Sequence, residues 1–109
     1  LFGSLFENMV VSEAVKARLH RGRDPNIYFF RDSNGNEVDL LLDRRPAPCP
    51  VEIKASLTLH KDLFKGLRTF QGLNPGSPPG WVIYGGDLES SGDGPGFLNF
   101  RHTERLFAD

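Results

Sequence analysis

The stretch 36–56 constrains the fold more than any other part of the chain, because two strand patterns flank a proline-rich connection. Each pattern alternates apolar and charged residues, which is typical of a strand with one buried face. The alternating residues are Glu37, Val38, Asp39, Leu40, Leu42 and Asp43 in the first strand and Val51, Glu52, Ile53 and Lys54 in the second. The connection 44–50 contains three prolines, whose missing backbone donors stop either strand from continuing. The segment therefore predicts two antiparallel neighbours.

The register of this pair is predicted from its apolar positions. Matching those positions across the connection places Leu40 opposite Ile53 and Leu42 opposite Val51. The charged residues of both strands then fall together on the other face of the pair.

That face brings Asp39 beside Glu52 and Lys54. Two carboxylates about 4 Å apart repel each other by roughly 4 kcal/mol at an effective dielectric constant of about 20, so the group needs a cation. Lys54 supplies one positive charge, and a hard divalent metal ion would supply more. The alternative is a solvated face on which Asp39 and Lys54 form an ordinary ion pair across the strands.

The composition is that of one globular domain, residues 1–109, with 39% hydrophobic and 25% charged residues. No apolar run approaches the roughly 20 residues needed to cross a bilayer, and no secretory signal pattern is visible in residues 1–109. The single cysteine, Cys49, excludes a disulfide framework, so we expect a cytoplasmic protein without a membrane partner. The formal net charge of -1 gives no overall attraction to nucleic acid. Because the chain opens on Leu1, we expect a fragment of a longer protein.

The remaining elements are predicted from hydrophobic spacing and turn residues. Apolar residues at helical spacing predict helices over 4–20 and 60–71. Runs of β-branched and aromatic residues predict strands over 26–31, 81–84 and 97–101. A turn at Asn34 and Gly35 predicts a hairpin between 26–31 and 37–42, and the glycine-rich stretch 85–96 predicts a mobile loop. The order αβββαβ indicates an α/β fold with a mixed sheet flanked by helices, and the end of the chain, 103–109, is left unassigned.

Three other groups have competing interpretations. Ser4 and Glu7 fit a capping box, which would occupy the Glu7 carboxylate at the start of the first helix. Glu37 is expected to form a surface ion pair with Arg31. The basic side of the helix 60–71, which includes Lys65, is expected to be solvated, with phosphate contact as the alternative.

The chain resembles a known superfamily in the spacing of its charged residues. Asp39 on one strand and Glu52-Ile53-Lys54 on the next resemble the core of the PD-(D/E)XK nucleases, although Val38 stands where that motif has proline. The combined order of four motifs is similar to the uncharacterised C-terminal domain that follows an AAA-type ATPase core in many prokaryotic proteins. These motifs are Gly3-Ser4-Leu5-Phe6-Glu7, Tyr28-Phe29-Phe30-Arg31, Glu37-Val38-Asp39 and Val51-Glu52-Ile53-Lys54.

The resemblance implies a restriction-endonuclease-like fold and a DNA phosphodiesterase site. Asp39, Glu52 and Lys54 would be the catalytic residues, and Mg²⁺, with Mn²⁺ as a substitute, would be bound by Asp39, Glu52, the Ile53 carbonyl and Glu7. The implied partners are DNA and an ATPase domain upstream in the same polypeptide. The alternative is a non-catalytic module that keeps this fold to bind nucleic acid or protein, or to regulate the ATPase.

Overall fold

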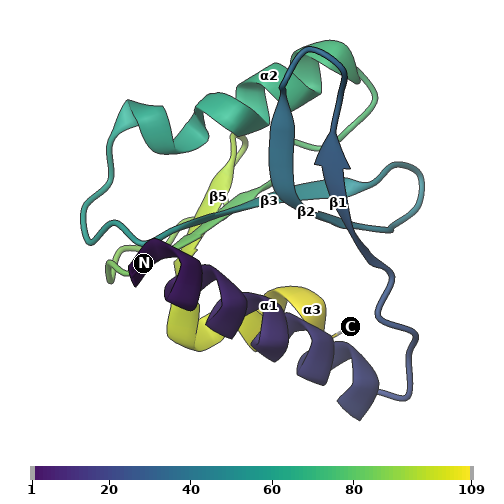
Figure 1. The fold of residues 1–109 in the computed structure, drawn as a ribbon, viewed down its shortest axis with the longest axis vertical. Coiled ribbons are helices and arrows are strands. Elements are labelled where there is room, and N and C mark those ends of the chain that lie inside the picture. The colour runs from purple at the N-terminus through teal and green to yellow at the C-terminus, as the bar shows by residue number, and fades with distance from the viewer. Residues whose placement is uncertain (1, 109) are drawn as a thin grey trace.

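The computed structural model describes residues 2–108 and arranges them as a five-stranded sheet with helices on both of its faces (Figure 1). The helices are α1 (Phe2–His20), α2 (Lys65–Leu73) and α3 (Thr103–Phe107), and the short 3-10 turns η1 (Lys61–Phe64) and η2 (Phe100–His102) precede α2 and α3. The strands are β1 (Ile27–Arg31), β2 (Glu37–Leu42), β3 (Cys49–Lys54), β4 (Trp81–Tyr84) and β5 (Gly96–Asn99).

The strands lie side by side in the order in which they occur in the chain. β1, β2 and β3 are antiparallel neighbours, whereas β4 runs parallel to β3 and β5 runs parallel to β4. Parallel neighbours require a crossover connection, and α2 with its 3-10 turn lies in the one between β3 and β4. The predicted mixed α/β architecture with the core order αβββαβ is therefore confirmed, and β5 and α3 extend it.

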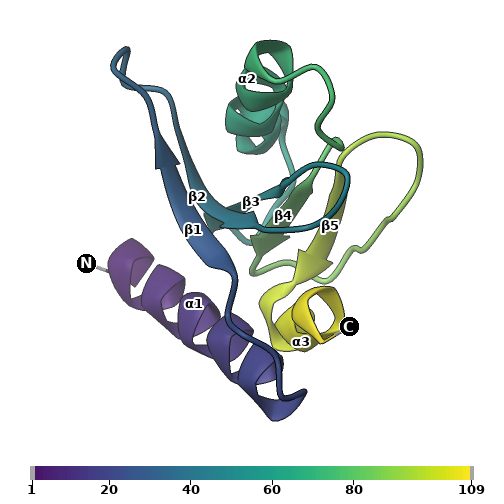
Figure 2. The same ribbon diagram turned by 90° about the vertical axis from the view of Figure 1, so that its right-hand side faces the viewer.

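The sheet is covered on both faces, by α1 and α3 on one side and by α2 on the other (Figure 2). The larger core lies toward α1 and α3 and includes Val10, Leu40, Val51, Ile83 and Phe107. The smaller core lies under α2 and is formed by Leu63, Leu67, Val82 and Tyr84. Because β4 contributes to both cores, its apolar run is buried on both faces, as the sequence predicts.

The start of α1 differs from the prediction. The helix already includes Phe2, so Ser4 and Glu7 lie inside it and do not form a capping box at its start. Near the start of α1, the buried ring of Phe6 meets that of Phe100 edge-on, with 5.3 Å between the ring centroids. The Glu7 carboxylate is therefore not occupied by capping.

The β2–β3 pairing is shifted by two residues from the predicted register. Leu40 lies opposite Val51 rather than Ile53, and Leu42 lies opposite Cys49 rather than Val51. β3 begins earlier than predicted, so the last proline of the expected connection lies inside the strand. A shift of two residues leaves every side chain on its predicted face, so the charged residues still share one side of the pair.

β1 and β2 form the predicted hairpin, but their pairing contains a bulge. Tyr28 pairs with Leu41 and Phe30 pairs with Val38. Between these two pairs β1 has one residue, Phe29, and β2 has two. The extra residue in β2 bends the strand and re-aims the side chains around it, an arrangement that often occurs beside active sites.

The second half of the chain departs from the prediction at element boundaries. The expected helix 60–71 consists of η1 followed by α2, and α2 continues to Leu73, past the glycine expected to end it. β5 ends at Asn99, where a strand was predicted to continue to 101, and the unassigned segment forms α3.

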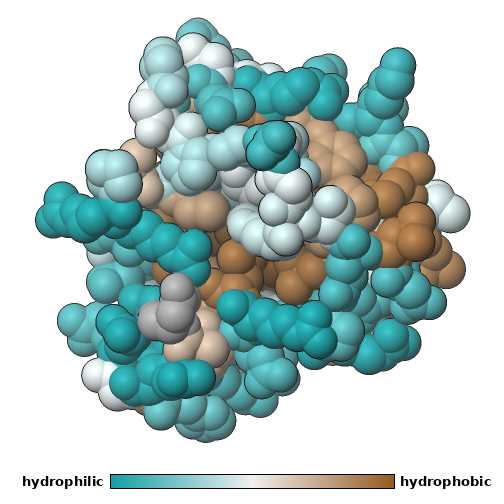
Figure 3. Space-filling view, turned by 180° about the vertical axis from the view of Figure 1, so that it is seen from behind, coloured by the Kyte–Doolittle hydropathy of each residue, from teal (hydrophilic) through white to brown (hydrophobic). Residues whose placement is uncertain are grey.

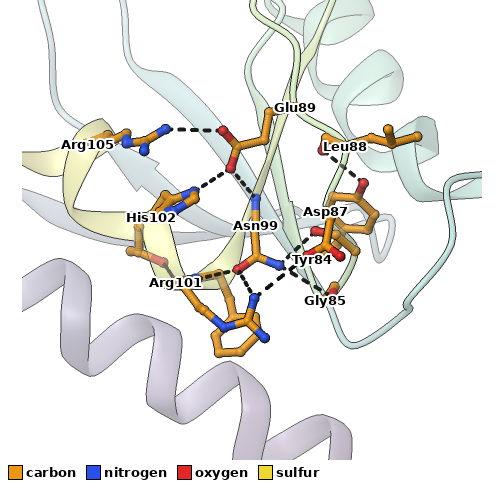
Figure 4. Close-up of polar contacts among 12 residues, drawn as sticks. Tyr84, Gly85, Asp87, Leu88, Glu89, Asn99, Arg101, His102 and Arg105 are labelled. Carbon is orange, nitrogen blue, oxygen red and sulfur yellow. Dashed lines mark hydrogen bonds and ion pairs between the residues drawn. The ribbon is translucent and has the colours of Figure 1, made fainter.

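Polar contacts tie the glycine-rich segment after β4 to the end of the chain (Figure 4). The side chain of Asn99, which is 2% exposed, donates to the Gly86 carbonyl at 2.8 Å and accepts a bond from the Arg101 N–H at 2.9 Å. The Glu89 carboxylate contacts the His102 ring and accepts the Asn99 N–H. The loop is therefore fixed at two points by residues that follow it in the chain.

The surface has an apolar region distinct from the predicted charged site. Figure 3 shows hydrophobic atoms gathered in the middle and along one side of the face opposite to that in Figure 1. At β5, a cavity of about 300 Å³ has Trp81, Phe97, Leu98 and Leu106 in its lining, and none of the predicted site residues.

Within residues 2–108, no helix combines the length and the apolar character needed to cross a bilayer.

Candidate functional site

Asp39 and Glu52 lie where the β2–β3 ladder ends. Leu40 and Val51 form the last backbone pair, and beyond it each carboxylate bonds the main chain of the opposite strand. The Asp39 N–H donates to Glu52 Oε1 at 3.0 Å, and the Ile53 N–H donates to Asp39 Oδ2 at 2.7 Å. The structure thus brings the two predicted acidic residues together, in contact with each other's strands.

Glu52 is buried under α2 and has Lys54 as its cationic partner. Lys54 Nζ lies 3.3 Å from Glu52 Oε2, and the two side chains are 38% and 6% exposed. Lys54 therefore pairs with the glutamate of its own strand rather than with Asp39. Gly66 of α2 lies over this carboxylate so closely that a Cβ at position 66 would come within 2.8 Å of Glu52 Oε2. The glycine permits the helix to pack onto a charged group.

The environment raises the pKa of both carboxyl groups. Burial is the main cause of the raised pKa of Asp39, and the Ile53 N–H and the Lys54 charge oppose it only in part. Burial is also the main cause of the raised pKa of Glu52, and the negative charge of Asp39 adds to it. Ionising this pair therefore costs free energy, and an additional positive charge beside it would reduce that cost.

Glu7 approaches the same group from α1. Its pKa is raised first by burial and then by the negative charges of Asp39 and Glu37, while Lys54 lowers it. Glu37 forms the predicted ion pair with Arg31, with 2.8 Å between Glu37 Oε2 and an Arg31 guanidinium nitrogen. The structure thus places Glu7 within the electrostatic reach of the acidic pair.

Two cavities meet at Asp39. The first, of about 300 Å³, is lined by residues of α2 and of the β1–β2 hairpin, together with Glu52 and Lys54. The hairpin rises beside α2 in both ribbon views (Figures 1 and 2). The second, of about 390 Å³, is lined by Glu7, by Phe29 and by other hairpin residues. Asp39 lines both cavities and is therefore accessible from two directions.

The acidic pair offers the oxygen ligands that Mg²⁺ prefers. One oxygen of Asp39 and one of Glu52 accept main-chain N–H groups, and the second oxygen of Glu52 faces Lys54 Nζ at 3.3 Å, so a cation at Glu52 would share that oxygen with Lys54. The Ile53 N–H points toward β2, and in a strand the carbonyl of a residue points to the same side as its N–H. Among residues 2–108, no three His, Cys, Asp or Glu side chains are grouped closely enough to hold a metal ion, so Glu7 does not complete a three-carboxylate group. The available donors are two carboxylates and one carbonyl, which fits a cation that keeps several waters.

The sequence prediction missed two contributors to the site. Gly66, which covers Glu52, occurs inside an amphipathic helix, where glycine is unfavourable, and that position is a signal of close packing. Phe30 forms part of the first cavity and meets Phe70 of α2 edge-on, with 5.0 Å between ring centroids. Lys65, which belongs to the predicted basic side of the helix, also lines this first cavity.

Comparison with known proteins gives one match. Residues 2–101 match a protein family described as "Domain of unknown function (DUF4143)". No curated protein and no solved structure is significantly similar to the chain. The matched segment runs from α1 to beyond β5 and contains every residue of the candidate site. The chain therefore belongs to the DUF4143 family, a family of domains of unknown function.

Proposed function

We propose that this domain is a nuclease-like module that hydrolyses a phosphodiester bond of DNA with the help of Mg²⁺, for which Mn²⁺ can substitute. The observation that carries the proposal is the convergence of Asp39, Glu52 and Lys54 on one face of the sheet beside a cavity of about 300 Å³. Two carboxylates of raised pKa with one ammonium group form a site that favours added positive charge. The resemblance of these strands to the PD-(D/E)XK nucleases supports the same reaction.

The proposed cation ligands are those that the donor chemistry allows. Asp39 and Glu52 would hold the ion with their carboxylate oxygens, and the Ile53 carbonyl would join them, while Glu7 of α1 would add negative charge nearby without being a ligand. When bound, the ion supplies positive charge for a phosphate oxygen and acidifies a bound water. Because the pKa of each carboxyl group is raised, protons compete with the metal ion for the two carboxylates. Binding of the ion should therefore weaken as the solution becomes acidic.

Lys54 is proposed to act on the phosphate. Its ammonium group is anchored by the buried Glu52 carboxylate, while its side chain remains 38% exposed. A cation held in place before the reaction stabilises negative charge that grows in the transition state without the cost of reorienting itself. Its loss should therefore lower kcat more than it weakens substrate binding.

The proposal extends to the partner domain. The order of motifs resembles the C-terminal domain found behind AAA-type ATPase cores, so we infer that an ATPase domain precedes this one in the same polypeptide. The polypeptide upstream of this domain should then contain the motif Gly-x-x-x-x-Gly-Lys-Ser/Thr, which forms the loop that binds nucleotide phosphates. Absence of that motif would remove the ATPase part of the proposal and leave the nuclease part intact.

One observation favours a second candidate function. The exchange of bonds between Asp39, Glu52 and the opposing main chains explains both carboxylates without a substrate, because it closes the end of the strand ladder. A non-catalytic module that binds nucleic acid or protein, or that regulates the ATPase, could keep these residues for folding alone. In that case, isosteric variants of Asp39 and Glu52 would change the stability of the domain, and neither the parent nor the variants would cleave DNA.

Cleavage assays distinguish the two functions. The protein would be incubated with supercoiled plasmid, single-stranded DNA and branched DNA in the presence of Mg²⁺ or Mn²⁺. We expect cleavage that falls by about a hundredfold or more in Asp39→Asn and in Lys54→Met, as for other losses of a group that acts on the transition state. Glu13→Gln, an exposed change on α1, serves as the control and should cut like the parent. Absence of cleavage by the parent, or equal cleavage by all variants, would leave the non-catalytic module as the function.

A further inference from the structure

The bulge in the β1–β2 hairpin gives the candidate site an exposed aromatic side chain. Phe29 is the single β1 residue that faces the bulged pair of β2, and Asp39 is one member of that pair. Phe29 is 74% exposed, although it belongs to a strand of the sheet. A large ring left in water has not gained the free energy that its burial would provide, so a ligand that covers it would gain that energy.

Phe29 belongs to the cavity that adjoins Asp39. This cavity of about 390 Å³ also has Arg31 and Glu7 in its lining, and Asp39 connects it to the cavity with Glu52 and Lys54. Its volume lies within the range of small-molecule sites. A ligand whose charged part reaches Asp39 can therefore place a flat apolar part against Phe29.

The charges around the two cavities restrict the kind of ligand. Within residues 2–108, five acidic and three basic side chains line them, which gives a net charge of -2 when all are ionised. Both duplex and single-stranded nucleic acids are bound largely through Lys and Arg contacts to their phosphates, and this surface provides few of them. Affinity must come from other contacts, namely a bound cation and the aromatic ring.

We propose that Phe29 is a stacking platform for an unpaired base, so that the site takes single-stranded nucleic acid. This inference rests on the proposed function, because the cation at Asp39 and Glu52 would hold the phosphate next to the stacked base. Every base has a flat face that an aromatic side chain can cover, whereas in a duplex that face is already covered by neighbouring base pairs. The platform therefore selects unpaired strands, frayed ends and flaps, without selecting sequence.

Binding can be measured separately from cleavage. A fluorescein-labelled single-stranded DNA oligonucleotide of mixed sequence would be titrated with the protein in Ca²⁺, followed by fluorescence anisotropy, with the matching duplex in parallel. We expect the single strand to bind more tightly than the duplex. Phe29→Ala should weaken its binding by about tenfold or more, and Phe29→Trp should restore it. Tyr28→Ala is the matched control, because Tyr28 is the neighbouring aromatic residue of β1, is 55% exposed, and lines neither cavity.

The outcomes separate this inference from the proposed function. Equal weakening by Phe29→Ala and Tyr28→Ala, tighter binding of the duplex, or no binding of either DNA would overturn the platform, even if the parent cleaves DNA. A Phe29-dependent preference for the single strand would support it, even if the cleavage assay gives no product. A change in oligomeric state with Phe29→Ala, seen by size-exclusion chromatography, together with unchanged DNA binding would assign the ring to a protein contact and also overturn it.

Discussion

At the scale of single residues, the candidate site depends on one buried carboxylate. Glu52 accepts the Asp39 N–H, faces Lys54 and lies under Gly66, so three neighbouring groups surround its carboxylate. A charged group in such a place needs partners that offset its loss of water. Its raised pKa shows that the present partners do so incompletely. Ionising Glu52 therefore costs more free energy in the folded protein than in the unfolded chain, and a further cation beside it would reduce that cost.

Glu52→Gln tests this conclusion through pH. A carboxyl group whose pKa is raised on folding contributes most to stability when protonated, and that contribution is lost as the pH rises from its ordinary pKa through the raised one. The glutamine can still accept the Asp39 N–H and cannot ionise. Without divalent ions, we expect the variant to have a higher free energy of unfolding than the parent near pH 7, and the difference should shrink as the pH falls toward the ordinary pKa of a glutamate. Urea titrations at several pH values measure the free energy of unfolding of the parent and the variant. The same pH dependence in both proteins would contradict a buried charge at Glu52.

Gly66→Ala tests the contact between α2 and the carboxylate. The added methyl group would come within 2.8 Å of Glu52 Oε2 and 3.1 Å of its Cδ, while the carboxylate is held by the Asp39 N–H. We expect the free energy of unfolding to fall by about 1–3 kcal/mol, because either the helix or the carboxylate must move.

The same helix provides the control for this substitution. Gly72 lies in α2 with nothing within 4 Å of the position that a methyl group would take, so Gly72→Ala should raise the free energy of unfolding by about 0.5–1 kcal/mol through helix propensity. Thermal and urea unfolding of the two variants should give changes of opposite sign. A stabilised Gly66→Ala would show that α2 does not press on Glu52.

At the scale of elements, the sequence predicts which segments form strands but not how they align. The alternation in 37–42 gives the bounds of β2 as the structure has them. The register is different because a shift of two residues keeps every face, so Leu40 fits Val51 as well as Ile53. The bulge at Asp39 leaves no sign in the hydrophobic pattern, and without it Phe29 could not be assigned to the site.

The ends of elements do not follow from local motifs alone. Ser4 and Glu7 satisfy the spacing of a capping box, yet α1 starts before them. The interior of the site was predictable for Asp39, Glu52 and Lys54, because these residues come from one hairpin and alternate on one face. Gly66 and Phe30 were not predicted, because their place at the site depends on how α2 and β1 pack, whereas Glu7 of α1 was expected there from the resemblance.

Asn99 links three elements, which leads to a prediction at this scale. Its side-chain amide donates to the Gly86 carbonyl and its oxygen accepts the Arg101 N–H, in a position that is 2% exposed. Asn99→Asp keeps the acceptor, loses the donor and places a charge against a carbonyl. We expect a loss of about 1–3 kcal/mol in the free energy of unfolding. Asn34→Asp in the exposed hairpin turn is the control, and equal urea midpoints for the two variants would show that the Asn99 contacts are unimportant.

At the scale of the whole molecule, the site joins both layers that cover the sheet. Glu7 comes from α1 on one face, and Gly66 comes from α2 on the other, while the acidic pair lies between them. A ligand bound at Asp39 would therefore be coupled to the stability of the complete fold, since anything that binds only the folded state stabilises it.

Divalent cations should reveal that coupling as a change in Tm. Mg²⁺ or Ca²⁺ should raise Tm near neutral pH, where the carboxylates are ionised, with about 2.7 kcal/mol expected at a hundredfold excess over Kd. The gain should shrink toward about pH 5, because protons then compete for carboxyl groups of raised pKa. Asp39→Asn, which can still accept the Ile53 N–H, should lose the gain, whereas Glu13→Gln should keep it. Differential scanning calorimetry makes the comparison, and equal gains for both variants would place cation binding elsewhere.

The bulge also separates two roles of strand residues, packing in the core and contact with a ligand. Leu42 of β2, together with Leu40 in the bulge itself, packs in the main core, whereas Val38 and Phe30, on the side of the bulge nearer the hairpin turn, line the cavity. Substitutions at the tip of the hairpin can therefore alter what the domain accepts while the interior keeps its packing. Relatives that differ in their ligands should have diverged first at this tip, and directed evolution of new specificities has its natural starting point there.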